Sequence, residues 1–473
     1  MNKLVWLSSP LVGLYFVVSY YANNIVLFLP VQVLSSVVGA VILCSLITLA
    51  MYLLSKDKLM ANLISVLIAV GVFTWGYNNM VSLVFMFGAI IIYFLKINNK
   101  IVVYLNRIAL LLLVGLLIVP LFNIAVYHAS LDYKPINDVI SDTDSPDIYY
   151  IILDSYASND IMASLGYDNS YFTGYLKEDG FVVEEDAFCN YPRTYISVPS
   201  ILAMDYIDDP GDREYCYQSI QTNKVFEQAH ELGYKVINLS SNWSGTEKIL
   251  YADENYEVPQ IINNSFSSQL WGSTLLRHFG IFPSMAEIQR KVILYQLDTL
   301  RQLPQQEDQP RFIFAHILIP HHACALFHGN GEIMEPNPSL TTEYVYFQHV
   351  DYINNQLEAV IDDIIGASPD SIIILQADEG ISTSEFYNEM YSTGWVNDTK
   401  LMKQRAFILS AYYLPREIEI PQSSVNTFRT VFREFLGCDY ENLDEIFYYP
   451  KVYITKGTGN PSKEFYDATD IIK

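Results

Sequence analysis

The chain has 473 residues, of which 51% are hydrophobic, and a formal net charge of -24 at pH 7. Only one acidic residue, Asp57, precedes residue 130, so nearly all the negative charge belongs to the part that follows. Such an acidic part is not expected to bind nucleic acid, nor to adhere by charge to anionic headgroups.

The first 130 residues are a succession of apolar runs with short polar breaks between them. The runs cover residues 4–20, 25–55, 59–77, 80–96 and 103–127. A membrane-spanning helix needs about 20 apolar residues, so the pattern predicts a transmembrane domain of about five helices over residues 1–130. A soluble helical core is the alternative, but it could not cover so many helices that are apolar all round.

Lysines in the polar breaks predict the orientation of these helices. Lys3, then Lys56 and Lys58, then Lys96 and Lys100 fall in alternate connections, whereas the connections between them carry no charge. Positively charged connections tend to stay in the cytoplasm, so an odd number of crossings places the rest of the chain outside. The sequence therefore predicts a multi-pass protein of the plasma (inner) membrane with an extracytoplasmic domain.

Strand-like and helix-like segments alternate after a predicted linker at residues 131–146. Strands are predicted at 148–153, 181–184, 234–239, 311–318, 371–377 and 406–414. Helices are predicted at 169–179, 198–206, 222–232, 343–366 and 425–436. This alternation is typical of a mostly parallel sheet with helices on both faces, so residues 147–473 are expected to form one α/β domain.

Polar residues follow two of the predicted strands. Asp154 closes the apolar run that starts at Ile148, and Asp378 and Glu379 close the run that starts at Ser371. Ligands of open α/β sheets gather beyond the carboxyl ends of the strands. Two carboxylate groups there, together with a hydroxyl from a third loop, suggest a metal-dependent phosphoryl-transfer site, although a single strand-end Asp is usually a turn former or a helix cap.

Thr194 is the candidate hydroxyl. A proline fits within a helix only in the first turn, so Pro199 predicts a helix start near Ser197, just after Thr194. An incoming phosphate would be stabilised at that positive helix end. A hydroxyl is a poor nucleophile unless a metal lowers its pKa, and a capping role for Thr194 is the alternative.

Three further side chains could contact a substrate. His316 lies within the predicted strand at 311–318, and His321 follows that strand, just after Pro320. Histidine suits proton transfer because its pKa lies close to working pH. Arg193, beside Thr194, could clamp an anionic oxygen bidentately or pair with surface carboxylates.

These motifs together resemble the sulfatase and alkaline-phosphatase superfamily. A strand ending in Asp154, then Thr194-x-x-Ser-Val-Pro-Ser, then a strand ending in Asp378 is most similar to membrane-anchored phosphoethanolamine transferases and lipoteichoic acid synthases, which also carry about five spans. The resemblance implies that Thr194 is the nucleophile and that His321 contacts the phosphate or protonates the leaving oxygen. It also implies that Asp154, Thr194, Asp378 and Glu379 hold the metal.

Glu379 departs from the histidine that most relatives have in an Asp-His-Gly motif. An all-oxygen ligand set favours Mn²⁺ or Mg²⁺ over Zn²⁺, which stays possible. No Asp-x-x-x-His follows Asp378, so one metal ion is expected. The substitution also leaves open a degenerate, inactive site.

The expected reaction moves a phosphorylated headgroup from a phospholipid to a glycan, lipid or polymer of the cell envelope. Hydrolysis of a sulfuric ester or phosphodiester is the alternative enzyme activity, and sulfate chemistry would need a modified Cys189. A membrane-anchored binding protein without activity is the third possibility. The five cysteines lack metal-site spacing, and Cys44 lies in a predicted span. The sequence does not tell whether Cys189, Cys216, Cys324 and Cys438 pair or stay free.

Overall fold

The computed structural model of the chain divides into two compact units. The first contains Met1–Lys134 and Pro259–Ile288, and the second contains Pro135–Val258 and Gln289–Lys473. The structure describes residues 5–25, 27–28, 30–95, 97–130, 145–258, 264–280, 283–303, 310–322, 326–335, 337–454 and 462–473. Most of the predicted linker, and Cys324, lie outside the described residues.

The first unit is built from five long helices. They are α1 (Ser8–Asn23), α2 (Pro30–Ser55), α3 (Lys58–Thr74), α4 (Asn79–Phe94) and α5 (Asn99–Ser130), preceded by the 3-10 helix η1 (Val5–Leu7). By length and composition, α2 and α5 can cross a membrane. The other three have 16 or 17 residues, fewer than the roughly 20 that a perpendicular span needs. Five crossings therefore stay a prediction, whereas two membrane helices meet the physical criterion.

A segment from the middle of the chain packs into this helical unit. It contains α12 (Ser265–Gly272) and η2 (Leu275–Phe279). Trp271 and Phe266 are buried in the apolar cluster that α1, α2 and α3 form. The backbone N–H of Gly76 donates to the carbonyl oxygen of Ser273 at 2.8 Å, and a Cβ at Gly76 would lie 2.1 Å from that oxygen. The sequence prediction placed this segment in the α/β domain at residues 147–473. The structure shows that it packs with the N-terminal helices instead.

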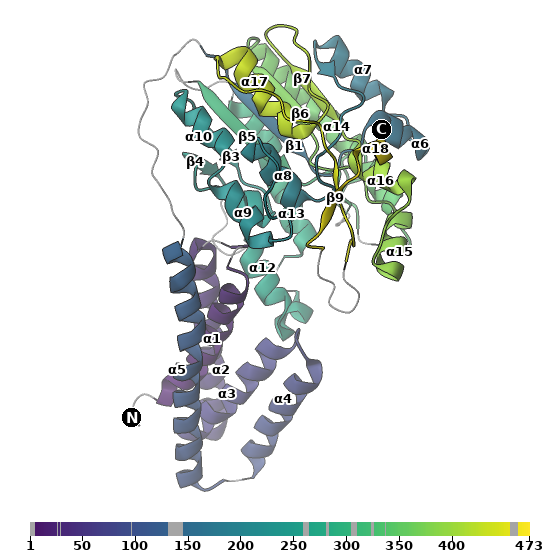
Figure 1. Cartoon of the computed structure of the whole chain (residues 1–473). Coiled ribbons are helices and arrows are strands. Elements are labelled where there is room, and N and C mark those ends of the chain that lie inside the picture. The colour runs from purple at the N-terminus through teal and green to yellow at the C-terminus, as the bar shows by residue number, and fades with distance from the viewer. Residues whose placement is uncertain are drawn as a thin grey trace. The chain divides into compact units, whose positions relative to one another are not determined.

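The second unit is organised around a seven-stranded sheet (Figure 1). Its order is β2-β7-β6-β1-β5-β3-β4. The strands are β1 (Ile148–Leu153), β2 (Val182–Val183), β3 (Lys235–Leu239), β4 (Glu254–Tyr256), β5 (Arg311–Ile317), β6 (Ile372–Gln376) and β7 (Ser410–Tyr413), and β8 (Tyr448–Pro450) and β9 (Phe465–Asp467) form a separate pair. Strands β6, β1, β5, β3 and β4 run parallel to one another. At the other edge of the sheet, β7 pairs antiparallel with β6, and β2 pairs antiparallel with β7. The predicted mostly parallel α/β sheet is confirmed.

Helices connect the strands of this sheet. They are α6 (Asn159–Ser164), α7 (Ser170–Glu178), α8 (Thr194–Ala203), α9 (Arg213–Gln221), α10 (Lys224–Glu231), α11 (Ser244–Glu247), α13 (Met285–Gln302), α14 (Thr342–Ala367), α15 (Ser384–Thr393), α16 (Thr399–Ala406), α17 (Thr427–Leu436) and α18 (Thr469–Ile472), with η4 at Ser424–Asn426. Even-numbered residues of β1, such as Tyr150 and Ile152, pack in one core with residues of α8, α10 and α17. Burial of that face fixes α8 over the central strands.

The start of α8 corrects the predicted one. The helix begins at Thr194 rather than near Ser197, because the backbone N–H of Ser197 already donates to the carbonyl of Arg193 at 2.8 Å. Pro199 therefore lies inside the helix, where it lacks the N–H that would reach the preceding turn. Tertiary contacts outweigh this loss: Pro199 is buried, and the Ser197 hydroxyl donates to the carbonyl of Asp378 at 2.5 Å.

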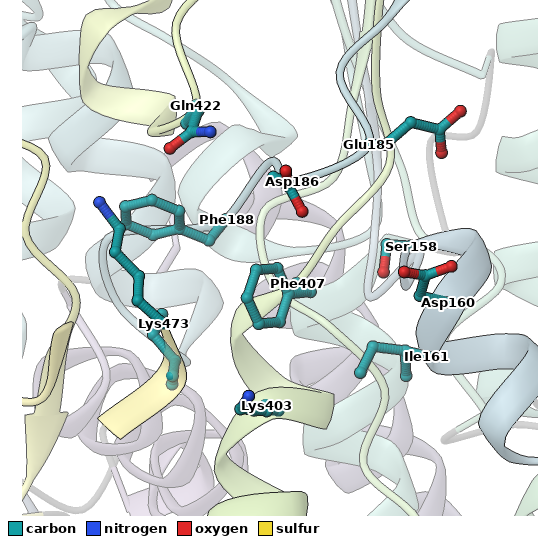
Figure 2. A pocket seen from close by; sticks show the side chains of 11 residues that line it. Ser158, Asp160, Ile161, Glu185, Asp186, Phe188, Lys403, Phe407, Gln422 and Lys473 are labelled. Carbon is teal, nitrogen blue, oxygen red and sulfur yellow. The ribbon is translucent and has the colours of Figure 1, made fainter. Parts of the chain in front are cut away.

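Among the cavities of the second unit is one of about 470 Å³ (Figure 2). Its wall carries both signs of charge, including Asp160, Glu185 and Lys403, and two aromatic rings, Phe188 and Phe407. Phe188 and Phe407 pair as an isolated antiparallel bridge. None of the residues predicted to carry the chemistry lines this cavity.

Candidate functional site

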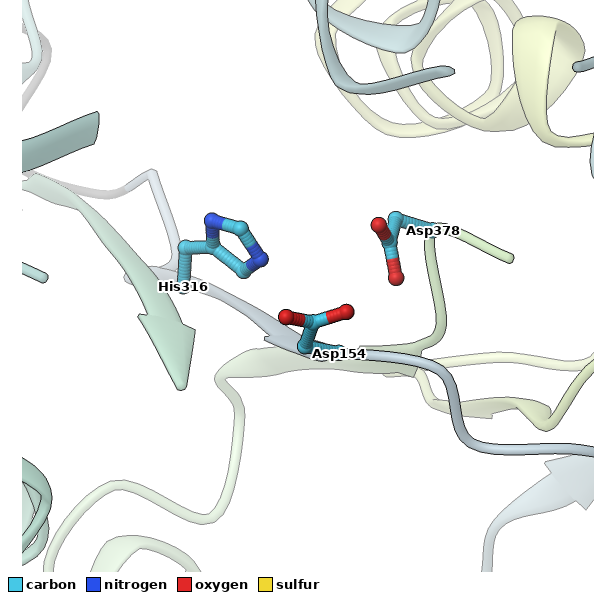
Figure 3. A group of neighbouring side chains, drawn as sticks. All are labelled: Asp154, His316 and Asp378. Carbon is cyan, nitrogen blue, oxygen red and sulfur yellow. The ribbon is translucent and has the colours of Figure 1, made fainter. Parts of the chain in front are cut away.

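The strand register brings three side chains to one point. Ile152 of β1 lies level with His316 of β5 on one side and with Gln376 of β6 on the other. Side chains alternate along a strand, so Asp154 and Asp378, two residues farther on, face the same side as His316. One ligand atom from each of the three lies within 4.8 Å of the others, and Figure 3 shows the side chains turned toward a common centre.

The three side chains are buried and incompletely hydrogen-bonded. The Nδ1 atom of His316 contacts the Thr246 hydroxyl at 3.0 Å, and the backbone N–H of Ser155 donates to Asp378 Oδ1 at 3.0 Å. His316 Nε2 and Asp378 Oδ2 have no hydrogen-bond partner among the described residues. Buried polar atoms normally have partners. A cation held by these atoms would satisfy both, so the residues fit a divalent metal ion.

The pKa values fit the same interpretation. Burial, together with the charge of Glu379, raises the pKa of Asp154 to about 7. Burial and the neighbouring Asp154 raise the pKa of Asp378 well above its ordinary value. Burial also lowers the pKa of His316 to about 3, so the imidazole stays neutral and keeps a lone pair for a metal. Two neighbouring buried carboxyl groups do not readily ionise at the same time, and a cation between them would stabilise their ionised forms.

Glu379, predicted as a metal ligand, has another partner. Its carboxylate forms an ion pair with Arg405, and both side chains are less than a tenth exposed. The three carboxylates of Asp154, Asp378 and Glu379 together with this guanidinium sum to a charge of -2, which a divalent cation would neutralise. The structure thus brings Asp154 and Asp378 together with His316, and it turns Glu379 toward Arg405.

Thr194 is the first residue of α8, and its side chain approaches Asp378 closely enough to lower the pKa of that carboxyl group. Arg193, the residue before it, is held by the C-terminal part of the chain. Its guanidinium donates to the carbonyl of Tyr453 and lies 4.3 Å from the centre of the Tyr453 ring.

His321 lies beside the carboxylate cluster. Its backbone N–H donates to the carbonyl of Asp154 at 3.0 Å, and its ring stacks on that of His322 with centroids 5.1 Å apart. Burial lowers the pKa of His321, while Glu379 raises it and Arg405 lowers it further. The imidazole therefore stands within electrostatic reach of the Glu379–Arg405 pair.

The sequence model of the family described as Sulfatase matches residues 146–432, which is more than half of the chain. The chain belongs to the Sulfatase family. It is thus an enzyme of the sulfatase and alkaline-phosphatase superfamily, as the motifs indicated. No curated protein matches the sequence.

Solved structures similar to this sulfatase-family chain include one described as a transferase and one described as a synthase. One is the integral membrane lipooligosaccharide phosphoethanolamine transferase A (EptA) from Neisseria meningitidis, with 12% identity, 91% of this chain and 95% of that chain covered, and a TM-score of 0.41. Another is the zinc complex of the C-terminal periplasmic domain of EcEptC from Escherichia coli, with 14% identity, 66% and 88% covered, and a TM-score of 0.41. The lipoteichoic acid synthase LtaP from Listeria monocytogenes has 13% identity, 72% and 84% covered, and a TM-score of 0.42.

Sequence reasoning undervalued one residue of the sulfatase-family site and missed another. His316 was only a weak substrate candidate, because an isolated strand histidine is usually structural. His316 lies level with Ile152, two residues before Asp154, so the two side chains face the same side of the sheet. That register is the signal that could have identified His316 as a candidate metal ligand. No local pattern marks Arg405, which lies at the end of α16 and reaches the site through the tertiary fold.

Proposed function

We propose that this protein is a membrane-anchored, metal-dependent phosphotransferase. It would move a phosphorylated headgroup, of the phosphoethanolamine or phosphoglycerol type, from a phospholipid to a hydroxyl of an envelope glycan, lipid or polymer. The observation that carries the proposal is the convergence of Asp154, His316 and Asp378 beside Thr194 at the start of α8.

Asp154, Asp378 and His316 are the residues proposed to hold one divalent ion. When bound, the ion supplies positive charge that lowers the pKa of a nearby hydroxyl and stabilises negative charge on phosphate oxygens. Two carboxylates with one imidazole suit Mn²⁺ or Zn²⁺ better than Mg²⁺, because nitrogen ligands shift the preference away from Mg²⁺. The sequence resemblance also implies Thr194 and Glu379 as ligands, and of these two Glu379 is paired with Arg405.

Thr194 is proposed to exchange the headgroup in two displacements. In the first, its Oγ1 forms a bond to phosphorus while the bond from phosphorus to the diacylglycerol oxygen breaks. In the second, the acceptor hydroxyl forms the bond to phosphorus and Thr194 leaves. The phosphate approaches the first turn of α8, whose N–H groups favour an anion.

His321 is proposed to move the protons that balance these steps. The proton of Thr194 ends on the diacylglycerol hydroxyl in the first step, and the proton of the acceptor hydroxyl returns to Thr194 in the second. Burial lowers the pKa of His321, so its resting imidazole is neutral and can accept a proton before passing it on.

The N-terminal helices are proposed to cross the plasma (inner) membrane several times and to keep the catalytic unit on the extracytoplasmic side. A lipid donor is concentrated at the bilayer surface, so anchoring raises its effective concentration at the site. Helices α2 and α5 support the membrane anchoring, since both are long and apolar enough to span. The further crossings and the extracytoplasmic side rest on the apolar runs and lysines of the sequence.

Sulfate-ester hydrolysis is a weaker alternative because of the surroundings of Cys189. Its side chain is fully buried, and its thiol donates to the carbonyl of Arg405 at 3.3 Å. Burial raises the pKa of this thiol well above its ordinary value, so it is no nucleophile. The buried atoms of His316 and Asp378 that have no hydrogen-bond partner among the described residues likewise favour an active metal site over an inactive scaffold.

The proposal is tested by following the headgroup. The full-length protein, reconstituted with Mn²⁺ in phosphatidylethanolamine and phosphatidylglycerol vesicles with radiolabelled headgroup phosphorus, should carry the label on the peptide that contains Thr194. Thr194→Ala should lose both the label and turnover, whereas Thr194→Ser should keep part of each.

A capping threonine provides the matched control. Thr341 accepts a hydrogen bond from the N–H of Tyr344 at the start of α14, so Thr341→Ala should lower stability by about 1 kcal/mol and leave the labelling intact. Label that persists in Thr194→Ala would refute the threonine route.

A further inference from the structure

The buried Arg405 joins the two loops that carry the candidate chemistry. Its guanidinium donates to the carbonyl of Pro192 at 2.8 Å and to the carbonyl of Gly380, and it forms the ion pair with Glu379. Pro192 lies two residues before Thr194, and Gly380 lies two residues after Asp378. One side chain therefore bridges the start of α8 and the end of β6.

The backbone at the end of α16 makes the same two connections. The carbonyl of Arg405 accepts the N–H of Gly380 at 3.0 Å and the thiol of Cys189 at 3.3 Å. The carbonyl of Ala406 accepts the N–H of Cys189 at 2.9 Å. Contact is close, because a Cβ on Gly380 would lie 2.1 Å from the carbonyl oxygen of Gln404. Gln404, Arg405 and Ala406, three consecutive residues of α16, thus contact both loops between them.

We propose that Arg405 is a positioning residue that fixes Thr194 relative to Asp378 by holding the carbonyls of Pro192 and Gly380 in one planar fork. The role rests on the proposed phosphotransfer. The guanidinium offers several N–H donors in a rigid plane, so it can serve two carbonyls and one carboxylate at once. Its charge also offsets that of Glu379, so the carboxylates of Asp154 and Asp378 remain for the cation.

Substitution of Arg405 by lysine separates the charge of the guanidinium from its planar hydrogen bonding. An ammonium group restores the positive charge beside Glu379, but it is a point donor on a flexible stem and lacks the planar fork. Arg405→Lys therefore keeps the charge balance and loosens the link between Pro192 and Gly380. A purely electrostatic role for Arg405 predicts that lysine restores full activity.

The test uses full-length protein in vesicles with Mn²⁺ and the small diester bis(p-nitrophenyl) phosphate. For Arg405→Lys we expect kcat to fall on the order of 10²-fold, since small misplacements of reacting groups have effects of that size. KM and the content of bound metal should not change. Hydrogen exchange at the amide of Ser197, whose N–H donates to the carbonyl of Arg193 at 2.8 Å, should become faster.

A second variant loosens the link without touching any charge. The Tyr453 hydroxyl donates to the same Pro192 carbonyl at 2.8 Å, so Tyr453→Phe should speed exchange at Ser197 and lower kcat by a smaller factor. This variant keeps the proposal testable if Arg405→Lys does not fold.

Arg311 provides the matched control. It is also buried, pairs with Asp147 and donates to the carbonyl of Leu303 at 2.6 Å, but it starts β5, at the sheet edge away from the site. Arg311→Lys should lower thermal stability and leave kcat and exchange at Ser197 unchanged.

The outcomes separate the positioning role from the proposed function. Wild-type kcat and wild-type exchange in Arg405→Lys would overturn the positioning role, as would a loss of metal equal to the loss of kcat. An inactive wild-type enzyme would overturn the proposed phosphotransfer, and faster exchange in Arg405→Lys would then still support the structural link.

Discussion

At the scale of single residues, the site is defined by two buried carboxyl groups, for which a metal cation and protons compete. Burial and the charge of Glu379 raise the pKa of Asp154, and burial and the charge of Asp154 raise the pKa of Asp378, because like charges repel at short range in a buried setting. Without a cation, both carboxyl groups tend to keep their protons. Metal binding must therefore release protons, and its strength must depend on pH.

The pKa of Asp154 predicts how stability changes with pH. The folded carboxyl group keeps its proton up to about pH 7, whereas an unfolded one releases it near 3.8. The folded state thus binds more protons in this window, so this group makes the metal-free protein less stable as pH rises through it. A bound Mn²⁺ removes that loss. The difference in Tm between Mn²⁺-loaded and EDTA-treated protein should widen as pH rises from about 4 to about 7.

The Asp154→Asn variant isolates this contribution, because an amide does not titrate. In that variant the gain in Tm from Mn²⁺ should be small and should vary little with pH. Differential scanning calorimetry of both proteins across the window measures the effect. A Mn²⁺-induced shift in the wild type that stays constant with pH would contradict the expected competition between metal and protons.

At the scale of secondary-structure elements, Gly380 is the position where the end of β6 meets α16. A Cβ there would lie 2.1 Å from the carbonyl oxygen of Gln404 and 3.0 Å from that of Phe407, and backbone atoms cannot yield as side chains do. Gly380→Ala should lower the free energy of unfolding by about 1–3 kcal/mol, the usual effect of overpacking. It should also reduce kcat, since α16 carries Arg405.

Gly366, in the last turns of α14, is the control for this substitution. A Cβ there meets nothing within 4 Å, so Gly366→Ala should be neutral or stabilise the helix by up to about 1 kcal/mol. Urea denaturation of both variants measures the contrast. Equal stability of Gly380→Ala and the wild type would show that the loop and α16 are not in firm contact.

The sequence predicted the strands that carry the site because their apolar runs are continuous and end in polar residues. The run at 148–153 coincides with β1, and the run at 371–377 contains β6. Helix α8 was less predictable, since the proline rule is local whereas its start depends on contacts with Asp378. The pairing of Glu379 with Arg405 was beyond sequence reasoning, because the two residues meet only through the fold of α16.

At the scale of the whole molecule, the chain passes between its two units three times, after Lys134, Val258 and Ile288. Within the segment Pro259–Ile288, α12 and η2 have only 8 and 5 residues, and nothing in their sequences distinguishes them from surface helices of an α/β domain. Only the packing of Trp271 and Phe266 among the N-terminal helices reveals where it belongs. The catalytic unit is therefore tied to the helical unit by a packed segment as well as by the linker.

This second connection predicts that Trp271 matters for lipid substrates but not for small soluble ones. Trp271 is 4% exposed within the cluster of α1, α2 and α3, so Trp271→Ala should weaken that packing by about 3–5 kcal/mol. Under the proposed anchoring, a loosened segment would hold the catalytic unit less firmly near its lipid donor, which would lower the effective concentration of that donor. Transfer from phosphatidylethanolamine vesicles should fall, while turnover of bis(p-nitrophenyl) phosphate should persist.

Phe279, on η2 of the same segment, is 67% exposed, so Phe279→Ala should leave the packing within the helical unit unchanged. Both variants are compared on both substrates, in the same vesicles and at the same Mn²⁺ concentration. If Trp271→Ala lost the two activities equally, the segment would act on the fold of the catalytic unit itself. If it lost neither, the linker alone would suffice to hold that unit at its lipid substrate.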